Sequence, residues 1–352
     1  MKKNLLLLFL SGLFFGGCGT DYEVLNSYES IILTADSSVK KFGETITFTV
    51  TNSQGDDLTE DAVFYVDGIE IDGNTYTSAE VGSHVVTAAY FDVESAPLQI
   101  SFHDGTIINF RKKLLIEDYT GTWCGYCPRV AYAIELVRDL TQDVVPVAIH
   151  RASSEPSSLI YDPYNFAEAE GLEVSLGGSG GYPKGYLNRN IRWTSLEPDH
   201  IDQAVALTQG ENPRLGLAMT AAVAEGNISL DVNVMFGKEF TNELKLVVYV
   251  LENGLIYDQY NYTSYYGGLD VLEGFEHNHT LRATLTPILG ESINSTETVF
   301  ENVYTKTFNV PVPANMENAE NIEFVAFIVD ETGRAVNVRA AHAGEDQEFE
   351  LL

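Results

Sequence analysis

The chain has 352 residues, which is enough for about two or three domains. It carries 20 Lys and Arg against 51 Asp and Glu, a net charge of −31, which excludes a basic surface for nucleic-acid phosphates. The same charge argues against attachment to an anionic membrane by surface charge alone. Apolar residues make up 45% of the chain and charged residues 20%, which is typical of a globular protein.

The N-terminus has the pattern of an export signal. Two lysines and an apolar run over residues 5–15 precede Gly16-Gly17-Cys18, and the chain then turns polar. The run is too short to span a bilayer, which needs about 20 residues. A cysteine after two glycines resembles a bacterial lipobox, so residues 1–17 are the predicted lipoprotein signal peptide and Cys18 the lipidation site. An ordinary secretory signal is the alternative. We expect a protein outside the cytoplasm that the N-terminal lipid attaches to a membrane.

Residues 18–103 are predicted to hold a tether and a first β domain. Threonines alternate with Ile46, Phe48 and Val50, which is typical of a half-buried strand. Hairpin signals follow at Asp67-Gly68 and Asp72-Gly73. Short strands separated by turns favour an immunoglobulin-like sandwich.

Residues 104–211 alternate between strand and helix patterns, whereas residues 212–352 return to strands. The first of these segments is predicted to have strands at 113–118, 144–150 and 184–188, and helices at 128–140, near 164–170 and at 198–207. The second has alternating or apolar strand patterns at 228–236, 244–250, 298–310 and 322–329. The fold class is therefore mixed, with an α/β segment between two all-β segments, the last a C-terminal β-sandwich.

A tyrosine-rich insertion over residues 257–268 interrupts the C-terminal strands. Its rings are expected to cover an edge of the sandwich, and a patch for a sugar or a peptide is the alternative. His277 and His279 follow it. Since no acid or thiol stands at ligand spacing beside them, we interpret them as packed or surface residues and not as metal ligands.

The chemistry of the chain is concentrated at Cys124 and Cys127, the two cysteines that remain of three once Cys18 is lipid-modified. They stand two residues apart, between an apolar strand and a helix that Pro128 opens. Unpaired N–H groups and the dipole at a helix N-terminus favour a thiolate. We therefore expect Cys124 to attack a disulfide and Cys127 to resolve the product.

Two further positions complete the predicted catalytic group and its shield. Asp118 lies six residues before the first cysteine, where it would accept or relay the proton of Cys127. The neighbouring Glu117 is the alternative for this buried acid. Trp123 would shield one side of the sulfur pair.

Tyr182 and Pro183 are predicted to bind substrate. If the bond between them is cis, it would place the Tyr182 backbone beside the sulfurs to pair with an extended polypeptide. A trans proline in an ordinary loop is the alternative.

The cysteine pair has two other interpretations. Disulfides persist outside the cytoplasm without any function, so a purely structural bond is one of them. A metal site with His150 is the other, and it is disfavoured because four ligands are not in sight. We predict no metal and no cofactor.

Four segments carry a family resemblance: residues 115–124, 181–189, 277–282 and 324–333. Through them the chain, from about residue 110 to 350, resembles the 28-kilodalton outer membrane protein family of Bacteroidota lipoproteins. The resemblance implies an outer-membrane lipoprotein with a thioredoxin-like central domain and a β-rich C-terminal domain. It does not imply a settled activity.

Two functions are compatible with these features. The first is a lipid-anchored thiol-disulfide oxidoreductase of the cell envelope, of reductase or isomerase type because Gly125-Tyr126 matches the dipeptide of periplasmic disulfide isomerases. Its partners would be exported proteins with thiols or disulfides, and an unidentified electron donor. The second is a surface binding protein or adhesin whose thioredoxin-like domain is a scaffold. Either would reside at the outer membrane, on its periplasmic face or on the cell surface.

Overall fold

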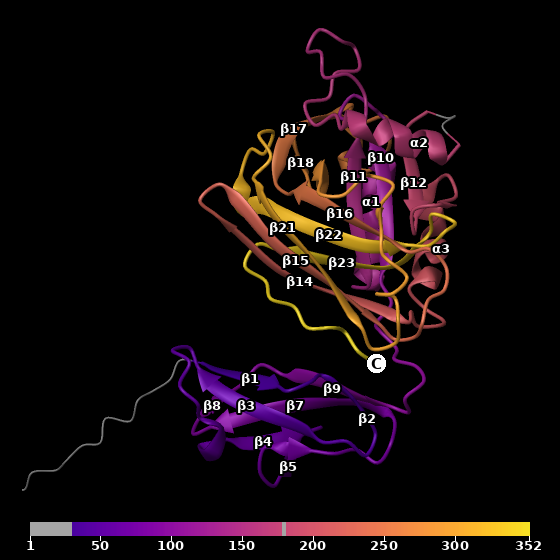
Figure 1. Ribbon diagram of the computed structural model, residues 1–352. Coiled ribbons are helices and arrows are strands. Elements are labelled where there is room, and N and C mark those ends of the chain that lie inside the picture. The colour runs from indigo at the N-terminus through magenta and orange to yellow at the C-terminus, as the bar shows by residue number, and fades with distance from the viewer. Residues whose placement is uncertain (1–29, 178–180) are drawn as a thin grey trace, which may run out of the picture.

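The computed structural model describes residues 30–177 and 181–352, so the predicted signal peptide and Cys18 lie outside the described residues. The described chain is mostly β-structure arranged in several sheets. Figure 1 shows a smaller N-terminal body below a larger one that contains the remaining strands and the helices. Among the described helices, none has the length and apolar character to cross a membrane.

The N-terminal body is a two-sheet β-sandwich. Ile46, Phe48 and Val50 point into its core, as their alternation predicts. Asp67 and Gly68 both have positive φ in the two-residue turn between β4 (Val63–Val66) and β5 (Ile69–Ile71), which is why this hairpin carries an Asp-Gly pair. One sheet contains β1 (Ile31–Ala35), β3 (Ile46–Asn52) and β6 (Thr75–Tyr76). The other contains β2 (Val39–Lys41), β4 (Val63–Val66), β5 (Ile69–Ile71), β7 (Gly82–Tyr90), β8 (Val93–Glu94) and β9 (Leu98–His103).

The larger body is built on one sheet that, within the described residues, has nine strands. Its first strands are β10 (Leu114–Thr120), β11 (Val144–His150), β12 (Lys184–Leu187) and β13 (Ile191–Arg192). Its later strands are β16 (Lys245–Glu252), β19 (Thr280–Thr284), β20 (Glu291–Ser292), β22 (Ile322–Val329) and β23 (Ala335–His342). β10 pairs in parallel with β11 and antiparallel with β12, and all of its residues are buried because other elements pack on both faces of the sheet. This central position explains the apolar run at the start of the strand, residues 114–116.

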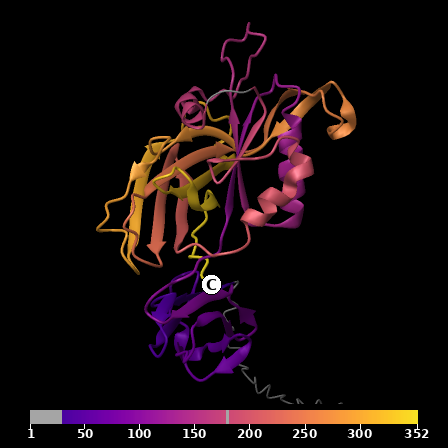
Figure 2. The ribbon, with the colours of Figure 1, turned by 90° about the vertical axis from the view of Figure 1, so that its right-hand side faces the viewer.

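Helices cover one face of the first strands. α1 (Pro128–Leu140) turns Val130, Ala133 and Val137 toward the sheet and toward α3 (Ile201–Leu207). Figure 2 shows α1 and α3 side by side on this face. α2 (Glu170–Ser175) follows a short 3-10 turn and packs on the opposite face of the sheet. The helix predicted near 164–170 thus lies several residues later in the chain.

The later strands form a β-sandwich with a second sheet. That sheet contains β14 (Leu215–Ala224), β15 (Asn227–Phe236) and β21 (Val303–Pro311). Its strictly alternating apolar residues meet those of β16 and β22 in a common core.

The large sheet continues across the predicted boundary near residue 211. β11 pairs in parallel with β19 through Ala148 and Thr280, so strands of both segments lie in one sheet. Leu115, Val147 and Ile149 share a core with residues of β16 and β22. Alternation predicts the faces of single strands, but this pairing joins residues more than a hundred positions apart and leaves no local signal.

Candidate functional site

Cys124 and Cys127 stand between the end of the central strand β10 and the start of α1. They form a disulfide with an S–S distance of 2.08 Å. Cys127 is the N-cap residue of α1, and Pro128 occupies the first turn, where its missing N–H is not needed. Cys124 is 5% exposed and Cys127 1%, so only a small part of the pair faces solvent.

Asp118 lies in the interior beneath the pair. Its carboxyl group and Cys127 line the same cavity, and its Oδ1 atom is buried with no hydrogen-bond partner. Burial raises the pKa of Asp118 well above its usual range, and the nearby Glu197 carboxylate raises it further. Arg129, which donates from Nε to Glu197 at 2.6 Å, opposes that rise. The site therefore contains an acid that holds its proton more strongly than an ordinary aspartate.

Glu117 is also buried, but it points to the other face of β10. The hydroxyl of Tyr249 donates to its Oε1 at 3.1 Å. Burial raises the pKa of Glu117, while Arg189 opposes the rise. Of the two candidate acids, Asp118 is the one that shares a cavity with Cys127.

Trp123 and Tyr182 meet beside the cysteine pair. Their rings contact edge to face, with centroids 5.9 Å apart, and Trp123 Nε1 donates to the carbonyl of Arg151 at 3.1 Å. The Tyr182–Pro183 peptide bond is cis. The structure thus brings these residues next to the strand–helix junction that carries Cys124.

A buried ion cluster that the sequence did not reveal holds Tyr182. Glu173 accepts hydrogen bonds from Arg151 Nε at 2.7 Å, from Lys184 Nζ at 2.9 Å and from the Tyr182 hydroxyl at 2.8 Å. Burial would raise the pKa of Glu173, but these donors lower it below its usual range. Burial and the Glu173 contact raise the pKa of Tyr182 to about 12. These partners come from separate segments, so spacing could not have identified them.

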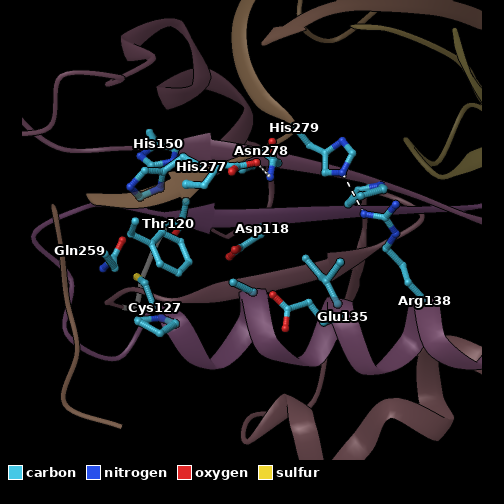
Figure 3. A pocket seen from close by; sticks show the side chains of 17 residues that line it. Asp118, Thr120, Cys127, Glu135, Arg138, His150, Gln259, His277, Asn278 and His279 are labelled. Atoms are coloured by element: carbon cyan, nitrogen blue, oxygen red, sulfur yellow. Dashed lines mark hydrogen bonds between the residues drawn. The ribbon is translucent and has the colours of Figure 1, made fainter. Parts of the chain in front are cut away.

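A cavity of about 150 Å³ opens between α1 and the strands that follow β10. Figure 3 shows Cys127 and Gln259 at one end and Arg138 and His279 at the other, with Asp118 between them. Glu135 faces it from the exposed side of α1.

The two histidines predicted to be packed or at the surface have different surroundings. His277 is buried against His150, with ring centroids 5.1 Å apart. Burial and His150 lower the pKa of His277 to about 3, so this ring stays neutral. His279 Nδ1 lies 2.7 Å from Glu323. Over residues 30–177 and 181–352, no three His, Cys, Asp or Glu side chains are grouped to bind a metal.

The tyrosine-rich insertion packs on the cysteine loop and not on a sandwich edge, so that expectation is wrong. It forms an arm of two strands, β17 (Leu255–Tyr260) and β18 (Val271–His277). Figure 2 shows this orange arm reaching past α1. Its Tyr265 ring stacks on Tyr132 of α1 with centroids 4.5 Å apart. Aromatic contacts of this kind stabilise the arm, although it lies outside the sandwich.

The arm also binds the backbone around the cysteines. Gln259 donates from Nε2 to the Cys124 carbonyl at 3.1 Å and faces the Gly121 carbonyl at 3.3 Å. The Tyr260 N–H donates to the Thr122 carbonyl at 2.9 Å, and the Tyr262 N–H to the Gly125 carbonyl at 2.6 Å. Neither Gln259 nor these contacts could be read from the sequence.

Residues 175–347 match the family model of the outer membrane protein Omp28. We refer to residues 175–347 as the Omp28 segment. The family resemblance expected from the sequence is thereby confirmed, and it associates the protein with the outer membrane of the cell envelope.

Solved structures show more distant similarity to the chain. HBP35 of Porphyromonas gingivalis is 19% identical, with a TM-score of 0.49 over 68% of this chain and 77% of that one. A structural-genomics protein of Agrobacterium tumefaciens is 13% identical, with a TM-score of 0.39 over 67% of this chain and 96% of that one. A search of the curated proteins finds no match.

The Omp28 segment supplies one side of the site but not the cysteines. Pro183 and the arm lie within it, whereas Asp118, Cys124 and Cys127 precede it. Residues of the Omp28 segment thus contact the disulfide loop directly, through Gln259 and the arm backbone.

Proposed function

We propose that this protein is a thiol-disulfide oxidoreductase of the cell envelope, of reductase or isomerase type, with a thioredoxin-like central domain over residues 104–211. The observation that carries the proposal is the Cys124–Cys127 disulfide at the start of α1, above the buried Asp118. A cysteine before a helix is stabilised as the thiolate, and the thiolate is the attacking species in disulfide exchange.

In the reducing direction, the thiolate of Cys124 attacks one sulfur of a substrate disulfide. A mixed disulfide forms and the other substrate sulfur leaves as a thiolate. Cys127 then loses its proton and attacks the Cys124 sulfur, which releases the second substrate thiol. Asp118 is the group in the shared cavity that accepts or relays this proton. The pair ends as the disulfide present in the structure.

The surroundings of the pair fit an extended polypeptide as substrate. Tyr182 and Pro183 would pair with its backbone, and Trp123 borders the same side. Exposed aromatic rings of Tyr126, Tyr260 and Tyr262 lie around the cysteine loop and would contact its side chains. Exported proteins with thiols or disulfides are the partners of this chemistry.

The proposal includes a lipid anchor at Cys18, after a signal peptide of residues 1–17. Residues 18–103 would then separate the membrane from the redox domain, and residues 212–352 would form the C-terminal β-sandwich domain. The Omp28 match supports the outer membrane as the location.

The test is reduction of insulin disulfides by the full-length chain, with dithiothreitol as electron source. Cys124→Ser should reduce the rate to the uncatalysed level because it removes the attacking sulfur. Cys127→Ser should accumulate a mixed disulfide through Cys124, since nothing resolves it. If the wild-type chain is no faster than Cys124→Ser, the oxidoreductase proposal is wrong.

A surface binding protein with a structural disulfide is the second candidate. The small exposure of Cys124, 5%, and the arm that covers its loop favour it. A structural disulfide would leave both serine variants equally inactive and would trap no mixed disulfide.

A further inference from the structure

We infer that Gln259 is a positioning residue for the cysteine pair and that, through it, the arm favours the disulfide over the two thiols. The inference rests on the proposed function and deepens it, because it names the element that sets the reduction potential of the site. Gln259 belongs to the Omp28 segment, whereas both cysteines precede that segment. A residue far away in the sequence thus regulates the redox pair.

Gln259 lies buried in β17, with its side-chain amide turned toward the cysteine loop. It is 3% exposed, and Figure 3 shows it beside Cys127. Its Nε2 atom lies 2.8 Å from the carbonyl oxygen of Tyr260, 3.1 Å from that of Cys124 and 3.3 Å from that of Gly121. A buried amide must keep such bonds, because an unpaired polar group in the interior is costly. The amide of Gln259 is therefore held against the loop.

Two of these carbonyls are also the acceptors for the N–H groups of the cysteines. The Cys124 N–H donates to the Gly121 carbonyl at 3.0 Å, and the Cys127 N–H donates to the Cys124 carbonyl at 3.0 Å. Gln259 thus contacts the acceptor of each turn that carries a cysteine. A movement of the loop that separated the two cysteines would break these turns and the contacts with Gln259 together. The contacts therefore keep the cysteines in the arrangement in which they form the disulfide.

The arm holds Gln259 in place from the neighbouring positions. The N–H groups of Tyr260 and Tyr262 donate to the carbonyls of Thr122 and Gly125. An aromatic pair also stacks the arm on α1. Because these contacts fix the backbone next to Gln259, its amide loses little further entropy when it binds the loop. The amide is therefore preorganised for the cysteine pair.

Holding the loop favours the disulfide for an entropic reason. Two thiols of one chain form a disulfide more readily when their positions are already fixed, because the effective concentration of one at the other is higher. In the reduced chain no bond joins the sulfurs, so the loop is freer to move and keeps less of its contact with Gln259. Linkage then requires that these contacts stabilise the disulfide by the free energy with which the disulfide stabilises them. A more stable disulfide makes the dithiol a stronger reductant, which suits the reductase direction.

The equilibrium with glutathione measures this preference. The first glutathione loses its proton and attacks Cys124, the Cys124–Cys127 bond breaks, and Cys127 leaves as a thiolate and takes up that proton. The second glutathione attacks the glutathione sulfur of the mixed disulfide, and Cys124 leaves as a thiolate that takes up the second proton. Two glutathione thiols are oxidised to one disulfide, and the pair gains two electrons and two protons.

The test compares the reduction potentials of full-length chains that carry Cys18→Ser, so that only the pair is counted. Gln259→Met removes the amide donors and nearly keeps the length of the side chain. It should lower the equilibrium constant for disulfide formation by about tenfold, about the effect of one buried hydrogen bond. A tenfold change raises the reduction potential of this two-electron couple by about 30 mV. Gln259→Asn draws the amide back from the loop by one methylene group and should shift the potential in the same direction.

Gln347→Met is the matched control. The Gln347 amide also donates to a backbone carbonyl, that of Ala340 in β23, at 2.8 Å. This substitution removes the same kind of bond without touching the cysteine loop, so it should leave the potential unchanged. Circular dichroism confirms the folding of each variant.

Urea unfolding of the oxidised and the reduced chains separates positioning from a merely structural role. Gln259→Met should lower the free energy of unfolding of the oxidised chain more than that of the reduced chain, because its contacts depend on the disulfide. Gln347→Met should lower both alike.

The inference is overturned if Gln259→Met leaves the reduction potential unchanged or lowers it, or if Gln347→Met raises it as much. Equal destabilisation of the oxidised and the reduced chains by Gln259→Met would overturn it as well. Neither measurement needs turnover of insulin, so the proposed function fails separately. A raised potential without insulin reduction would refute the oxidoreductase and leave Gln259 as the support of a structural disulfide. Insulin reduction with an unshifted potential would refute the inference alone.

Discussion

Asp118 has its carboxyl group where water cannot solvate a negative charge. Burial and the Glu197 carboxylate raise its pKa, and Arg129 and Arg192 compensate for only part of that rise. Below the ordinary aspartate pKa the group is neutral in both folded and unfolded chains. Between the unfolded and the folded pKa, the carboxyl group is ionised only in the unfolded chain. The free energy of unfolding therefore falls as the pH rises through this range and levels off above the folded pKa.

Asp118→Asn should therefore stabilise the folded chain, and the gain should be larger at pH 7 than at pH 4. The amide group of Asn replaces the carboxyl group and carries no charge that folding would have to bury. Urea unfolding of the oxidised chain at both pH values measures the effect. Asp139→Asn, on the exposed side of α1, is the matched control and should show no such rise. A gain independent of pH would contradict the assigned environment of Asp118.

Sequence reasoning identified the residues of the site that lie within one short segment. Asp118, Trp123 and both cysteines belong to a single strand–loop–helix unit, so local pattern was sufficient to place them together. Glu173, Arg151 and Gln259 could not be predicted as parts of the site, because their contacts depend on how distant segments fold. Gln259, for example, reaches a carbonyl 135 residues away.

At the scale of elements, the arm and the cysteine loop fit each other closely at Gly125. A Cβ added to Gly125 would lie 2.3 Å from the Tyr262 ring. The backbone of Tyr262 cannot move away to relieve this contact, because its N–H donates a hydrogen bond to the Gly125 carbonyl. Packing against Tyr262 therefore requires glycine at position 125, independently of any effect of the Gly125-Tyr126 dipeptide on the redox potential.

Gly125→Ala should destabilise the chain by about 1–3 kcal/mol through overpacking against Tyr262. Tyr262→Ala should remove most of that cost, because the two changes act on one contact. Thermal and urea unfolding of both single variants and the double variant measure the coupling. An equal cost of Gly125→Ala in both backgrounds would show that the arm does not pack there in solution.

The bounds of α1 were predictable, whereas the position of the arm was not. Pro128 at the first turn and apolar residues on one face specify a helix locally. The tyrosines of the arm fit equally well against a sandwich edge or a helix, and only the contacts with Tyr126 and Tyr132 decide between them.

At the scale of the whole molecule, the central segment and the Omp28 segment share one sheet and one core. Leu115, Val147 and Ile149 pack with Leu251 and Phe327 from the later strands. Without them, one face of β10 and β11 would lie open to water.

Residues 104–211 expressed alone should therefore fail to fold cooperatively. Loss of buried apolar partners costs several kcal/mol, about as much as the stability of a small domain. Circular dichroism and urea unfolding test this, with residues 104–352 as the control that retains the shared sheet. A sharp unfolding transition of the short fragment would contradict a shared core.

The reduction potential of the Cys124–Cys127 pair tests the central claim most directly. Equilibration of the chain with defined glutathione mixtures, followed by thiol counting, gives this value. A redox-active pair is expected between about −120 and −270 mV, in the range of known disulfide exchangers. A potential below about −300 mV would mark a structural disulfide and contradict the account.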